Sequence, residues 1–553
     1  MNIGWELSGV AERTPNAMAV VEPAGRNADG TRKYNSISFR ELDEDSSRIA
    51  AGLHDYGVKP GMRLALLVKP GIDFVSLVFA LFKAGVVTIL IDPGMGRDNL
   101  VRCLEEAEPE GFVAIPLAQA VRVVKRSRFT KAKFNVTVGR RWFWGGTTLA
   151  KLRGTSRMLD EIQSDDQDPA AIIFTTGSTG PPKGVLYRHG NFANQVSQIR
   201  DRYEIQPGEV DLPGFPLFGL FNSAMGVTTV FPEMDFTRPA DVNPKYILEH
   251  VADWSPSQSF GSPALWNTVG KHCEKTGESF RSIKRVLSAG APVPPHVLAR
   301  VKAAIAEDGE IHTPYGATEA LPVASISATE VLGETAERSA QGAGTCVGRR
   351  FDGITWRVIR ISDAPIESIE DAVELPRSDT GELIVQGPVV TTEYVTRPDA
   401  NAIAKIRDGE KFWHRMGDCG YLDEQDRFWF CGRKSHRVKV AAGTMFTVPC
   451  EAIANGHPKV YRSALVGIGD HAEKTPVMIV ELWPEHKSLD TAAANKLLDE
   501  VHERLASSWL TDTIERRHVL LHPSFPVDIR HNAKIFREKL APWAKEQILA
   551  DGR

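Results

Sequence analysis

The stretch FTTGSTGPPKGVLYRHGN, residues 174–191, combines the residue types that hold a phosphate group. Its glycines let backbone amides approach anionic oxygens, its hydroxyls donate hydrogen bonds, and Lys183 adds a positive charge. Pro181 and Pro182 restrict the conformations of the loop. The stretch therefore predicts an anion-binding loop with the candidate residues Thr175, Thr176, Gly177, Ser178, Thr179, Gly180 and Lys183.

The spacing within this loop excludes two common nucleotide-binding patterns. Gly177, Gly180 and Lys183 fit neither the G-x-x-x-x-G-K-[ST] loop nor the dinucleotide pattern G-x-G-x-x-G. The preceding AAIIF run predicts a buried strand, so the loop would leave the carboxyl end of a sheet, where α/β proteins bind ligands. Taken alone, the loop leaves an ordinary glycine-rich surface loop as an equal alternative.

Further motifs follow the loop along the chain. They are LSAGAP (287–292), PYGATE (314–319), GELIVQGP (381–388), HRMGDCGYLD (414–423), CGRKSHRVKV (431–440) and HNAKIFREKL (531–540). With the loop, its RHGN end and the earlier stretch AGVVTILIDPG, they resemble, in the same order, the motifs of the acyl-adenylate-forming superfamily. This superfamily includes acyl-CoA synthetases, peptide-synthetase adenylation domains and beetle luciferases. The resemblance covers nearly the whole chain.

The resemblance implies that a carboxylate attacks the α-phosphorus of ATP to give an acyl-AMP and pyrophosphate. Because two anions must meet, cations and oriented dipoles have to offset their repulsion. By this resemblance the loop at 175–183 holds the β- and γ-phosphates, Thr318 contacts the α-phosphate and Glu319 ligates Mg²⁺. On the adenine, Tyr315 stacks beside Gly316, and the turn formed by Gly290, Ala291 and Pro292 lies along the other side.

Three more roles follow from the same resemblance. Asp418 accepts both ribose hydroxyls, Arg433 reinforces the ribose side, and Lys534 reaches the α-phosphate and the substrate carboxylate. Each residue also has a structural alternative, such as a turn for Asp418, a helix start for Glu319 or a plain surface lysine for Lys534. At two places the chain departs from the residues that are usual in the family. Asn532-Ala533 stands where the family has Ser-Gly, which concerns the loop before Lys534, and Ser435 stands at the family's hinge position.

The acyl side is predicted from FPLFGLF, residues 215–221. It resembles the family's acyl-side motif, but Gly219 stands where a histidine is common, which we expect to open space near the reacting carboxylate. The surrounding apolar residues suit a bulky hydrocarbon acid better than an amino acid, and FPLFGLF has no acidic residue to pair with an amine. The alternative is that these residues are core packing.

Among subfamilies, the chain most resembles the β-lactone synthetases of bacterial long-chain olefin biosynthesis. The resemblance implies a 2-alkyl-3-hydroxy acid whose own hydroxyl attacks the activated acyl carbon, expels AMP and closes a β-lactone without CoA. His189 is a candidate base for that hydroxyl. The implied pathway partners are a thiolase-like condensing enzyme, a reductase and a β-lactone decarboxylase.

Three alternatives remain open at this point. A long-chain fatty acid–CoA ligase shares every nucleotide motif. A freestanding amino-acid adenylation domain is less well supported, because no carrier-protein serine motif follows the lysine motif. A non-catalytic binding protein of the same fold is disfavoured by the intact Glu319, Asp418, Arg433 and Lys534.

The composition and net charge of the chain argue against several classes of protein. The chain has 553 residues and a formal net charge of −4, which argues against a dedicated nucleic-acid binder. No run reaches the ~20 apolar residues that a bilayer requires, and the N-terminus lacks a secretory signal, so we expect a cytoplasmic protein without a membrane span. The 6 cysteines form no Cys-x-x-Cys pair and are expected to be buried thiols. A dimer is plausible only as a base rate for soluble enzymes.

The elements that must position these motifs follow from hydrophobic periodicity. Residues 36–91 predict helix, strand, helix and strand, and this alternation continues through AAIIFTT and RVLSAG. We expect an α/β fold with parallel sheets layered with helices. The predicted division is a large multi-subdomain N-terminal domain, residues 1–433, and a small mobile C-terminal α+β domain, residues 434–553, carrying Lys534.

One segment departs from the average composition. Residues 121–146 carry many arginines and lysines and end in Trp142, Phe143 and Trp144. The favoured interpretation is a solvated basic helix followed by a loop packed on the core. The alternative is a docking surface for a partner protein, for which the pathway enzymes are the candidates, for a membrane, or for a long-chain substrate.

Overall fold

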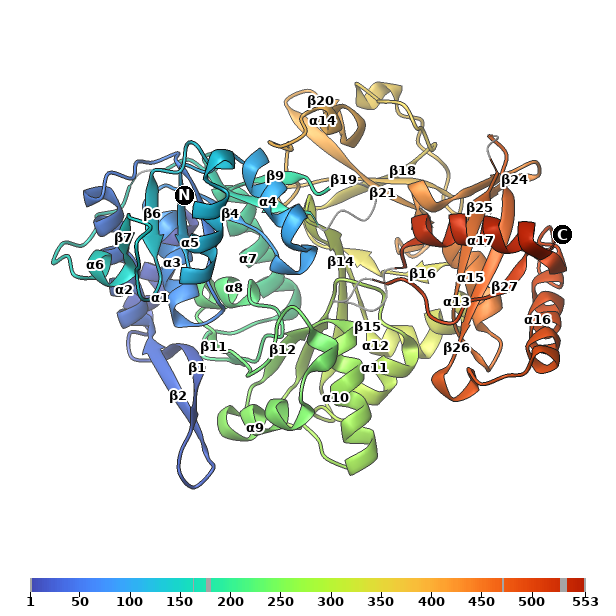
Figure 1. Cartoon of the computed structure of the whole chain (residues 1–553), viewed down its shortest axis with the longest axis horizontal. Helices are drawn as coiled ribbons and strands as arrows, with labels where there is room; N and C mark the ends of the chain where they lie inside the picture. Colours follow the sequence, from blue (N-terminus) through green and yellow to red (C-terminus); the bar gives the residue numbers. More distant parts are fainter. Residues whose placement is uncertain (1, 163, 176–180, 470–471, 528–534, 552–553) are drawn as a thin grey trace.

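The computed structural model describes residues 2–162, 164–175, 181–469, 472–527 and 535–551. Three large sheets and a smaller C-terminal sheet form the framework, and helices cover them (Figure 1). The chain runs from the N-terminal part on the left of the view, through the centre, to the C-terminal part on the right.

The first sheet is largely parallel, as predicted. Its order is β7-β6-β5-β3-β4-β8-β9, and only β8 and β9 pair antiparallel. The strands are β3 (Arg63–Leu67), β4 (Val87–Leu90), β5 (Gly111–Ala114), β6 (Phe134–Thr137), β7 (Thr147–Thr148), β8 (Pro169–Phe174) and β9 (Gly184–Arg188). The helices among them are α2 (Phe39–Asp55), α3 (Ile72–Lys83), α4 (Arg97–Glu106), α5 (Pro116–Val124) and α6 (Leu149–Arg153).

The second sheet has a parallel centre and antiparallel edges. Its order is β17-β15-β14-β13-β12-β10-β11-β1-β2. The strands are β1 (Met18–Arg26), β2 (Arg32–Ser38), β10 (Val210–Asp211), β11 (Thr228–Val230), β12 (Gln258–Gly261), β13 (Arg285–Ser288), β14 (Glu310–Ala317), β15 (Ala320–Ser327) and β17 (Arg349–Arg350). Its helices are α1 (Glu6–Arg13), α7 (His189–Tyr203), α8 (Phe218–Met225), α9 (Pro244–Trp254), α10 (Pro263–Thr276), α11 (Pro295–Lys302), α12 (Ala328–Glu330) and α13 (Ala336–Ala340).

The third sheet is antiparallel, which the helix–strand alternation did not predict. Its order is β16-β22-β21-β19-β18, and β20 pairs with β21. The elements are β16 (Thr345–Cys346), β18 (Thr355–Ile359), β19 (Gly381–Gln386), α14 (Asp399–Ala404), β20 (Lys405–Asp408), β21 (Lys411–Leu422) and β22 (Phe428–Arg433). Short connections such as the one between β21 and β22 permit only antiparallel pairing.

The C-terminal part has its own hydrophobic core around the sheet β25-β26-β27. Its elements are β23 (Val438–Val440), β24 (Gly443–Met445), α15 (Thr447–Asn455), β25 (Val460–Ile468), β26 (Thr475–Leu482), α16 (Thr491–Ala506), β27 (Val519–Leu521) and α17 (Arg537–Asp551). Helix α15 contacts β22 of the third sheet. A boundary at residue 434 stays a prediction.

Several local predictions are confirmed by the structure. Helix α2 begins at a capping box, in which Ser38 and Glu41 satisfy each other's backbone N–H groups. The apolar run at 75–91 is a buried helix, α3, that leads into a buried strand, β4. All six cysteines are buried and free. Across the described ranges, no helix combines the length and apolarity that crossing a membrane requires.

The basic segment differs from its favoured interpretation. Helix α5 ends at Val124, so most of the basic residues follow it in a turn rather than on a helix. Strand β6 then separates Lys133 from the loop that contains Trp142 and Phe143. Leu117, Val121 and Val124 of α5 are exposed rather than packed on the core. The loop residues Trp142 and Phe143 are exposed as well, whereas Trp144 is buried.

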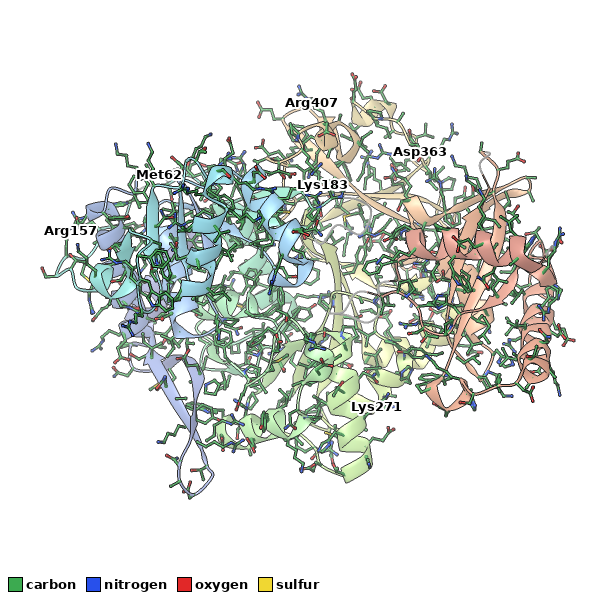
Figure 2. The ribbon with its side chains drawn as sticks, viewed as in Figure 1. Met62, Arg157, Lys183, Lys271, Asp363 and Arg407 are labelled. Carbon is green, nitrogen blue, oxygen red and sulfur yellow. The ribbon has the colours of Figure 1, made fainter. Side chains whose placement is uncertain are left out.

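A buried cluster of charges fixes the start of the C-terminal part. The Glu382 carboxylate, fully buried on β19, pairs with Arg415 at 2.6 Å and with Lys434 at 2.9 Å. Asp363 holds the same stretch from the surface through Arg437 at 2.6 Å. Figure 2 labels Asp363 beside the junction of the third sheet and the C-terminal part.

We predict that Glu382→Gln lowers the free energy of unfolding by about 3–5 kcal/mol, because it leaves two buried cations without a counter-ion. Asp363→Asn is the matched control, since it weakens an exposed pair on the same stretch and should cost about 1 kcal/mol or less. Denaturant unfolding of both variants measures the difference. Equal effects would show that the buried cluster does not stabilise this junction.

Candidate active site

One cavity of about 2980 Å³ lies where the three large sheets and the C-terminal part meet. Most of the predicted site residues that the structure describes line it. They are Thr175, Lys183, Gly290, Ala291, Pro292, Tyr315, Gly316, Thr318, Glu319, Asp418 and Arg433. Motifs more than 250 residues apart in the sequence therefore border the same space.

The two ends of the phosphate loop are pinned together. The Thr175 N–H donates to the Lys183 carbonyl at 3.0 Å, and the Lys183 N–H donates to Thr175 Oγ1 at 3.1 Å. The Lys183 ammonium lies 4.9 Å from the Tyr394 ring centroid, in the centre of the molecule (Figure 2). The remaining predicted loop residues, Thr176, Gly177, Ser178, Thr179 and Gly180, lie outside the described residues.

The hairpin between β14 and β15 presents four predicted residues to the cavity. Gly316 has no room for a side chain, because an added Cβ would lie 2.6 Å from the Ala320 carbonyl oxygen. The Tyr187 hydroxyl donates to the Thr318 carbonyl at 2.5 Å and fixes the turn. Thr318 and Glu319 therefore occupy a tight, braced turn at the cavity wall.

Strand register creates the pair Asp418 and Arg433. The two residues are direct cross-strand partners on β21 and β22, and Arg433 Nη1 donates to Asp418 Oδ1 at 2.8 Å. The Tyr315 hydroxyl donates to Asp418 Oδ2. Burial raises the pKa of the Asp418 carboxyl, whereas Arg433 and the Tyr315 hydrogen bond oppose that rise. The site thus contains an oriented two-oxygen acceptor next to a fixed cation.

Glu319 is held in place by Thr391 and Tyr394, which lie outside its motif PYGATE. The Tyr394 hydroxyl donates to Glu319 Oε1 at 2.5 Å, and both the N–H and the hydroxyl of Thr391 donate to the Glu319 carbonyl. Among the residues described, no three His, Cys, Asp or Glu side chains gather as metal ligands. A single carboxylate suits Mg²⁺, which is often bound through one or two carboxylates and substrate phosphates.

A buried lysine supports the Glu319 brace. The Lys405 ammonium donates to the Thr391 carbonyl and lies 5.8 Å from the Tyr394 ring centroid. Burial lowers its pKa to about 7, although Glu319 and Glu393 raise it in part. The neighbouring His414 lines the cavity, and burial together with Lys405 lowers the pKa of its imidazole well below the usual value.

The turn after β13 borders the cavity close to Tyr315. Gly290 has a φ of +95°, a conformation that favours glycine. Because β13 and β14 are adjacent parallel strands, the turn carrying Gly290, Ala291 and Pro292 and the strand carrying Tyr315 lie side by side. This placement agrees with two walls of one planar binding slot.

The structure places His189 away from the cavity. Its side chain is buried at the start of α7, its Nδ1 accepts from the Ile3 N–H at 3.4 Å, and its ring packs edge-on against Phe82. Burial lowers its pKa to about 4. His189 is not among the residues that line the cavity. The placement argues against the prediction that His189 acts as a base, and for a role in attaching the N-terminus.

The structure also corrects the expectation for Gly219. A Cβ at this position would lie 3.2 Å from the Phe231 ring and 3.3 Å from the Thr229 methyl group. The missing side chain therefore leaves no space at the cavity, because these two residues already fill it. The flanking residues Phe215, Leu217, Phe218, Leu220 and Phe221 do line the cavity, as predicted for an acyl site.

Lys534 lies outside the described residues, but its surroundings border the cavity. Ile535 and Arg537 line it, and the Arg537 guanidinium pairs with the Glu451 carboxylate at 2.6 and 2.8 Å. Burial raises the pKa of Glu451, and Arg537 opposes that rise. The chain that follows Lys534 is therefore anchored at the cavity edge.

Sequence reasoning missed Tyr187, Thr391, Tyr394 and Lys405. Tyr187, Thr391 and Tyr394 act through contacts with residues far away in the sequence; Tyr394 and Glu319, for example, are 75 positions apart. Lys405 acts through Thr391, 14 positions earlier. Only GELIVQGP was interpreted in this region, and it ends at Pro388. The antiparallel bridge of Ala320 with Val390 brings the later segment to the hairpin, and no local pattern signals that bridge.

Comparisons with known proteins agree with this geometry. The family model for the AMP-binding enzyme matches residues 7–395. The olefin beta-lactone synthetases of Xanthomonas campestris pv. campestris and Stenotrophomonas maltophilia are 43% and 44% identical over 99% of this chain and 98% of their own length. The solved amide bond synthetase of Marinactinospora thermotolerans superposes with a TM-score of 0.78 at 20% identity, over 98% of this chain and 99% of its own. That likeness shows the fold.

The low pKa of Lys405 gives a prediction about stability. The unfolded chain holds this proton up to pH 10.5 and the folded chain only to about pH 7, so the unfolded state binds the extra proton between these values. Stability should therefore rise with pH above 7, by at most about 1.4 kcal/mol per pH unit from this group. Lys405→Met should remove that rise.

Thermal unfolding of the wild type and of Lys405→Met between pH 6 and pH 9 checks this prediction. Lys411→Met, at an exposed position of the adjacent strand β21, controls for the loss of a lysine. A constant difference in stability between wild type and Lys405→Met across this range would mean that Lys405 stays protonated in the folded protein.

Proposed function

Because the chain belongs to the AMP-binding enzyme family and is an ATP-dependent, AMP-forming enzyme, we propose that it makes a β-lactone from a long-chain 2-alkyl-3-hydroxy acid. The acid is first activated as an acyl-AMP, and its own 3-hydroxyl then displaces AMP. The observation that carries the proposal is the single cavity, which joins the nucleotide motifs to an apolar chamber.

In the first step, the substrate carboxylate oxygen bonds to the α-phosphorus of ATP and pyrophosphate leaves. Lys183 and the loop at 175–183 hold the departing phosphates, and Thr318 contacts the α-phosphate. Glu319 would hold Mg²⁺, and the bound ion would supply positive charge to the phosphate oxygens. The braces from Tyr394, Thr391 and Lys405 support this role, because they keep the Glu319 carboxylate aimed before the substrates arrive.

The nucleoside is bound by residues from two sheets. Tyr315 and the turn of Gly290, Ala291 and Pro292 flank the adenine, with Gly316 beside it, and Asp418 accepts the ribose hydroxyls. Arg433 keeps Asp418 ionised and oriented. Without nucleotide, the Tyr315 hydroxyl donates to Asp418 Oδ2, the oxygen that the ribose also needs. Binding of the ribose would therefore replace this one hydrogen bond with two from the ribose hydroxyls.

Lys534 supplies the charge at the reacting carboxylate from the C-terminal part. We propose the division into residues 1–433 and 434–553, with movement of the smaller unit as the gating step. Ser435 is exposed at this junction, and the Glu382 cluster beside it provides a fixed anchor for the movement. The Arg537–Glu451 pair supports this role, because it holds the chain that follows Lys534 at the cavity edge.

In the second step, the 3-hydroxyl oxygen bonds to the acyl carbon, the bond between that carbon and the AMP oxygen breaks, and the hydroxyl proton passes to solvent. Both reacting groups belong to one molecule, so proximity replaces a second substrate. The cavity volume of about 2980 Å³ well exceeds the ~300–1,000 Å³ typical of small-ligand pockets. This volume includes the nucleotide side. On the acyl side, Phe215, Leu217, Phe218, Leu220 and Phe221 provide an apolar lining that suits a hydrocarbon acid.

A long-chain fatty acid–CoA ligase is the second candidate, because it shares the first step. The 43% and 44% identities to olefin beta-lactone synthetases favour the lactone. We further propose that the enzyme is cytoplasmic and works with a thiolase-like condensing enzyme, a reductase and a β-lactone decarboxylase, since its substrate and product require such chemistry.

A product assay tests the proposed reaction. Purified protein with ATP, Mg²⁺ and a long-chain 2-alkyl-3-hydroxy acid, without CoA, should yield AMP and the ring protons of a β-lactone by NMR. An acid lacking the 3-hydroxyl is the control and should give no lactone. A thioester that forms only after CoA is added would assign the chain to the CoA ligases instead.

The role of Glu319 is tested by Glu319→Gln. The amide oxygen still accepts from Tyr394, but the negative charge that attracts Mg²⁺ is lost. We expect AMP formation to fall by about 100-fold or more and to recover in part at raised Mg²⁺. Glu393→Gln, in the adjacent segment outside the cavity lining, should leave the rate and the Mg²⁺ dependence unchanged. An unchanged Mg²⁺ dependence in Glu319→Gln would refute the ligand role.

A further inference from the structure

The N-terminal part exposes an apolar surface that the proposed reaction does not explain. Helix α5 leaves Leu117 73%, Val121 43% and Val124 78% exposed, and the loop after β6 leaves Trp142 62% and Phe143 83% exposed. Spacings of four and three residues place the three aliphatic side chains on one helix face. We call these five residues the α5 patch.

The loop and the helix form one surface. The Arg122 guanidinium on α5 donates to the Trp144 carbonyl at 3.2 Å, so the loop lies against the helix. The Trp142 ring stacks on the buried Trp144 ring at 5.7 Å between centroids. The exposed aromatic rings are therefore held beside the apolar face of α5 rather than projecting elsewhere.

Positive charge surrounds the α5 patch. Residues 115–146 contain no acidic residue, although the chain as a whole has a net charge of −4. The basic residues of this segment are Arg122, Lys125, Arg126, Arg128, Lys131, Lys133, Arg140 and Arg141. Arg128 and Lys131 pair with Glu105 and Glu108 near the end of α4. Lys125, Arg126 and Arg140 are exposed and have no ion pair with any described residue.

The cavity reaches this surface. Its lining includes Leu100, Val101 and Leu104 from α4 and the same Leu117, Val121 and Val124 that α5 exposes. Side chains that are both exposed and part of the lining mark a mouth of the cavity. An apolar path therefore connects the α5 patch with the acyl side of the site.

We propose that the α5 patch docks on an anionic lipid bilayer and that the long-chain acid enters the cavity from the lipid between α4 and α5. Aromatic and aliphatic side chains bordered by Lys and Arg are typical of protein surfaces that lie in the membrane interface. Anionic headgroups attract such bases over about a Debye length. All the charged residues of 115–146 are basic, and this segment therefore complements a surface of uniform negative charge better than a protein surface of mixed charge.

The docking itself is independent of the proposed reaction, and only the entry of the acid rests on it. Acids with two long alkyl chains partition into lipid rather than water. Through an opening that faces the bilayer, the acid can enter the cavity directly from the lipid without crossing water. Helix α5 lies in the N-terminal part, on the other side of the molecule from α16 and α17 of the C-terminal part (Figure 1).

Co-sedimentation with vesicles, without ATP or acid, tests the docking. The full chain should bind vesicles of equal parts phosphatidylglycerol and phosphatidylcholine and should bind pure phosphatidylcholine at least tenfold less well. Arg126→Gln with Arg140→Gln should lower the partition coefficient roughly fivefold per charge. Trp142→Ser with Phe143→Ser should lower it more than tenfold. Trp509→Ser, at a position 84% exposed in the C-terminal part, is the matched control and should bind like the wild type.

Either of two results would overturn the docking: equal binding to both kinds of vesicle, or patch variants that bind anionic vesicles like the wild type. Loss of binding to an acidic protein in these variants, without any vesicle binding by the wild type, would assign the surface to a protein partner instead. All substituted side chains are exposed, so we expect the variants to fold like the wild type. Circular dichroism checks this and excludes unfolding as the cause of lost vesicle binding.

A second measurement separates this proposal from the proposed reaction. With the acid embedded in anionic vesicles, Trp142→Ser with Phe143→Ser should form AMP at least tenfold more slowly than wild type. With a short, water-soluble 3-hydroxy acid the two rates should agree, since neither residue lines the cavity. If wild type binds vesicles but forms AMP from neither acid, the proposed reaction fails and the docking stands. Equal rates on the embedded acid would overturn entry from the lipid.

Discussion

The site depends on holding two carboxylates in fixed positions where more negative charge will arrive. The structure meets this constraint in the same way twice. A tyrosine hydroxyl donates to each carboxylate, from Tyr315 to Asp418 and from Tyr394 to Glu319, and a cation lies nearby. Arg433 is bound directly to Asp418, whereas Lys183 and Lys405 reach Glu319 through the Tyr394 ring and the Thr391 backbone. Burial raises the pKa of the Asp418 carboxyl, and Arg433 together with the Tyr315 hydrogen bond opposes that rise. The same kind of contact fixes the direction of both carboxylates, for which we propose a ribose and a metal ion as ligands.

The architecture distributes these partners so that no sheet holds a complete site. The parallel sheets supply loops at their carboxyl ends, where backbone groups are available for anions and for a planar ring. The antiparallel sheet supplies Asp418 and Arg433, because its register fixes two side chains opposite each other. The C-terminal part approaches through a stretch that Glu382 holds at Lys434. The movement that we propose for the C-terminal part would therefore alter the reacting end of the cavity. It would leave intact the nucleoside end, which the second and third sheets form together.

Local sequence patterns predicted most helices and strands and most residues that line the cavity. This worked because the conformation of loops such as PYGATE depends on neighbouring residues in the sequence. These patterns did not predict the braces, because Tyr394, Thr391 and Lys405 meet Glu319 only through a bridge between distant segments. The placement of His189 and the packing at Gly219 differ from expectation for a related reason. A motif position specifies a residue type, whereas the direction of its side chain depends on neighbours such as Ile3 and Phe231. The antiparallel sheet was missed because alternating helices and strands dominate the pattern elsewhere.

The mouth of the cavity at α5 has a consequence for substrate selection. A closed pocket limits the length of the hydrocarbon chain that it accepts, because the chain cannot extend past the end wall. Here the residues at the far end of the lining, Leu117, Val121 and Val124, are themselves exposed, and that end has no wall. A chain that follows this path can extend beyond the protein, and each additional methylene group neither clashes nor gains a contact. On the entry path that we propose, the protein therefore sets no upper limit on the length of that chain.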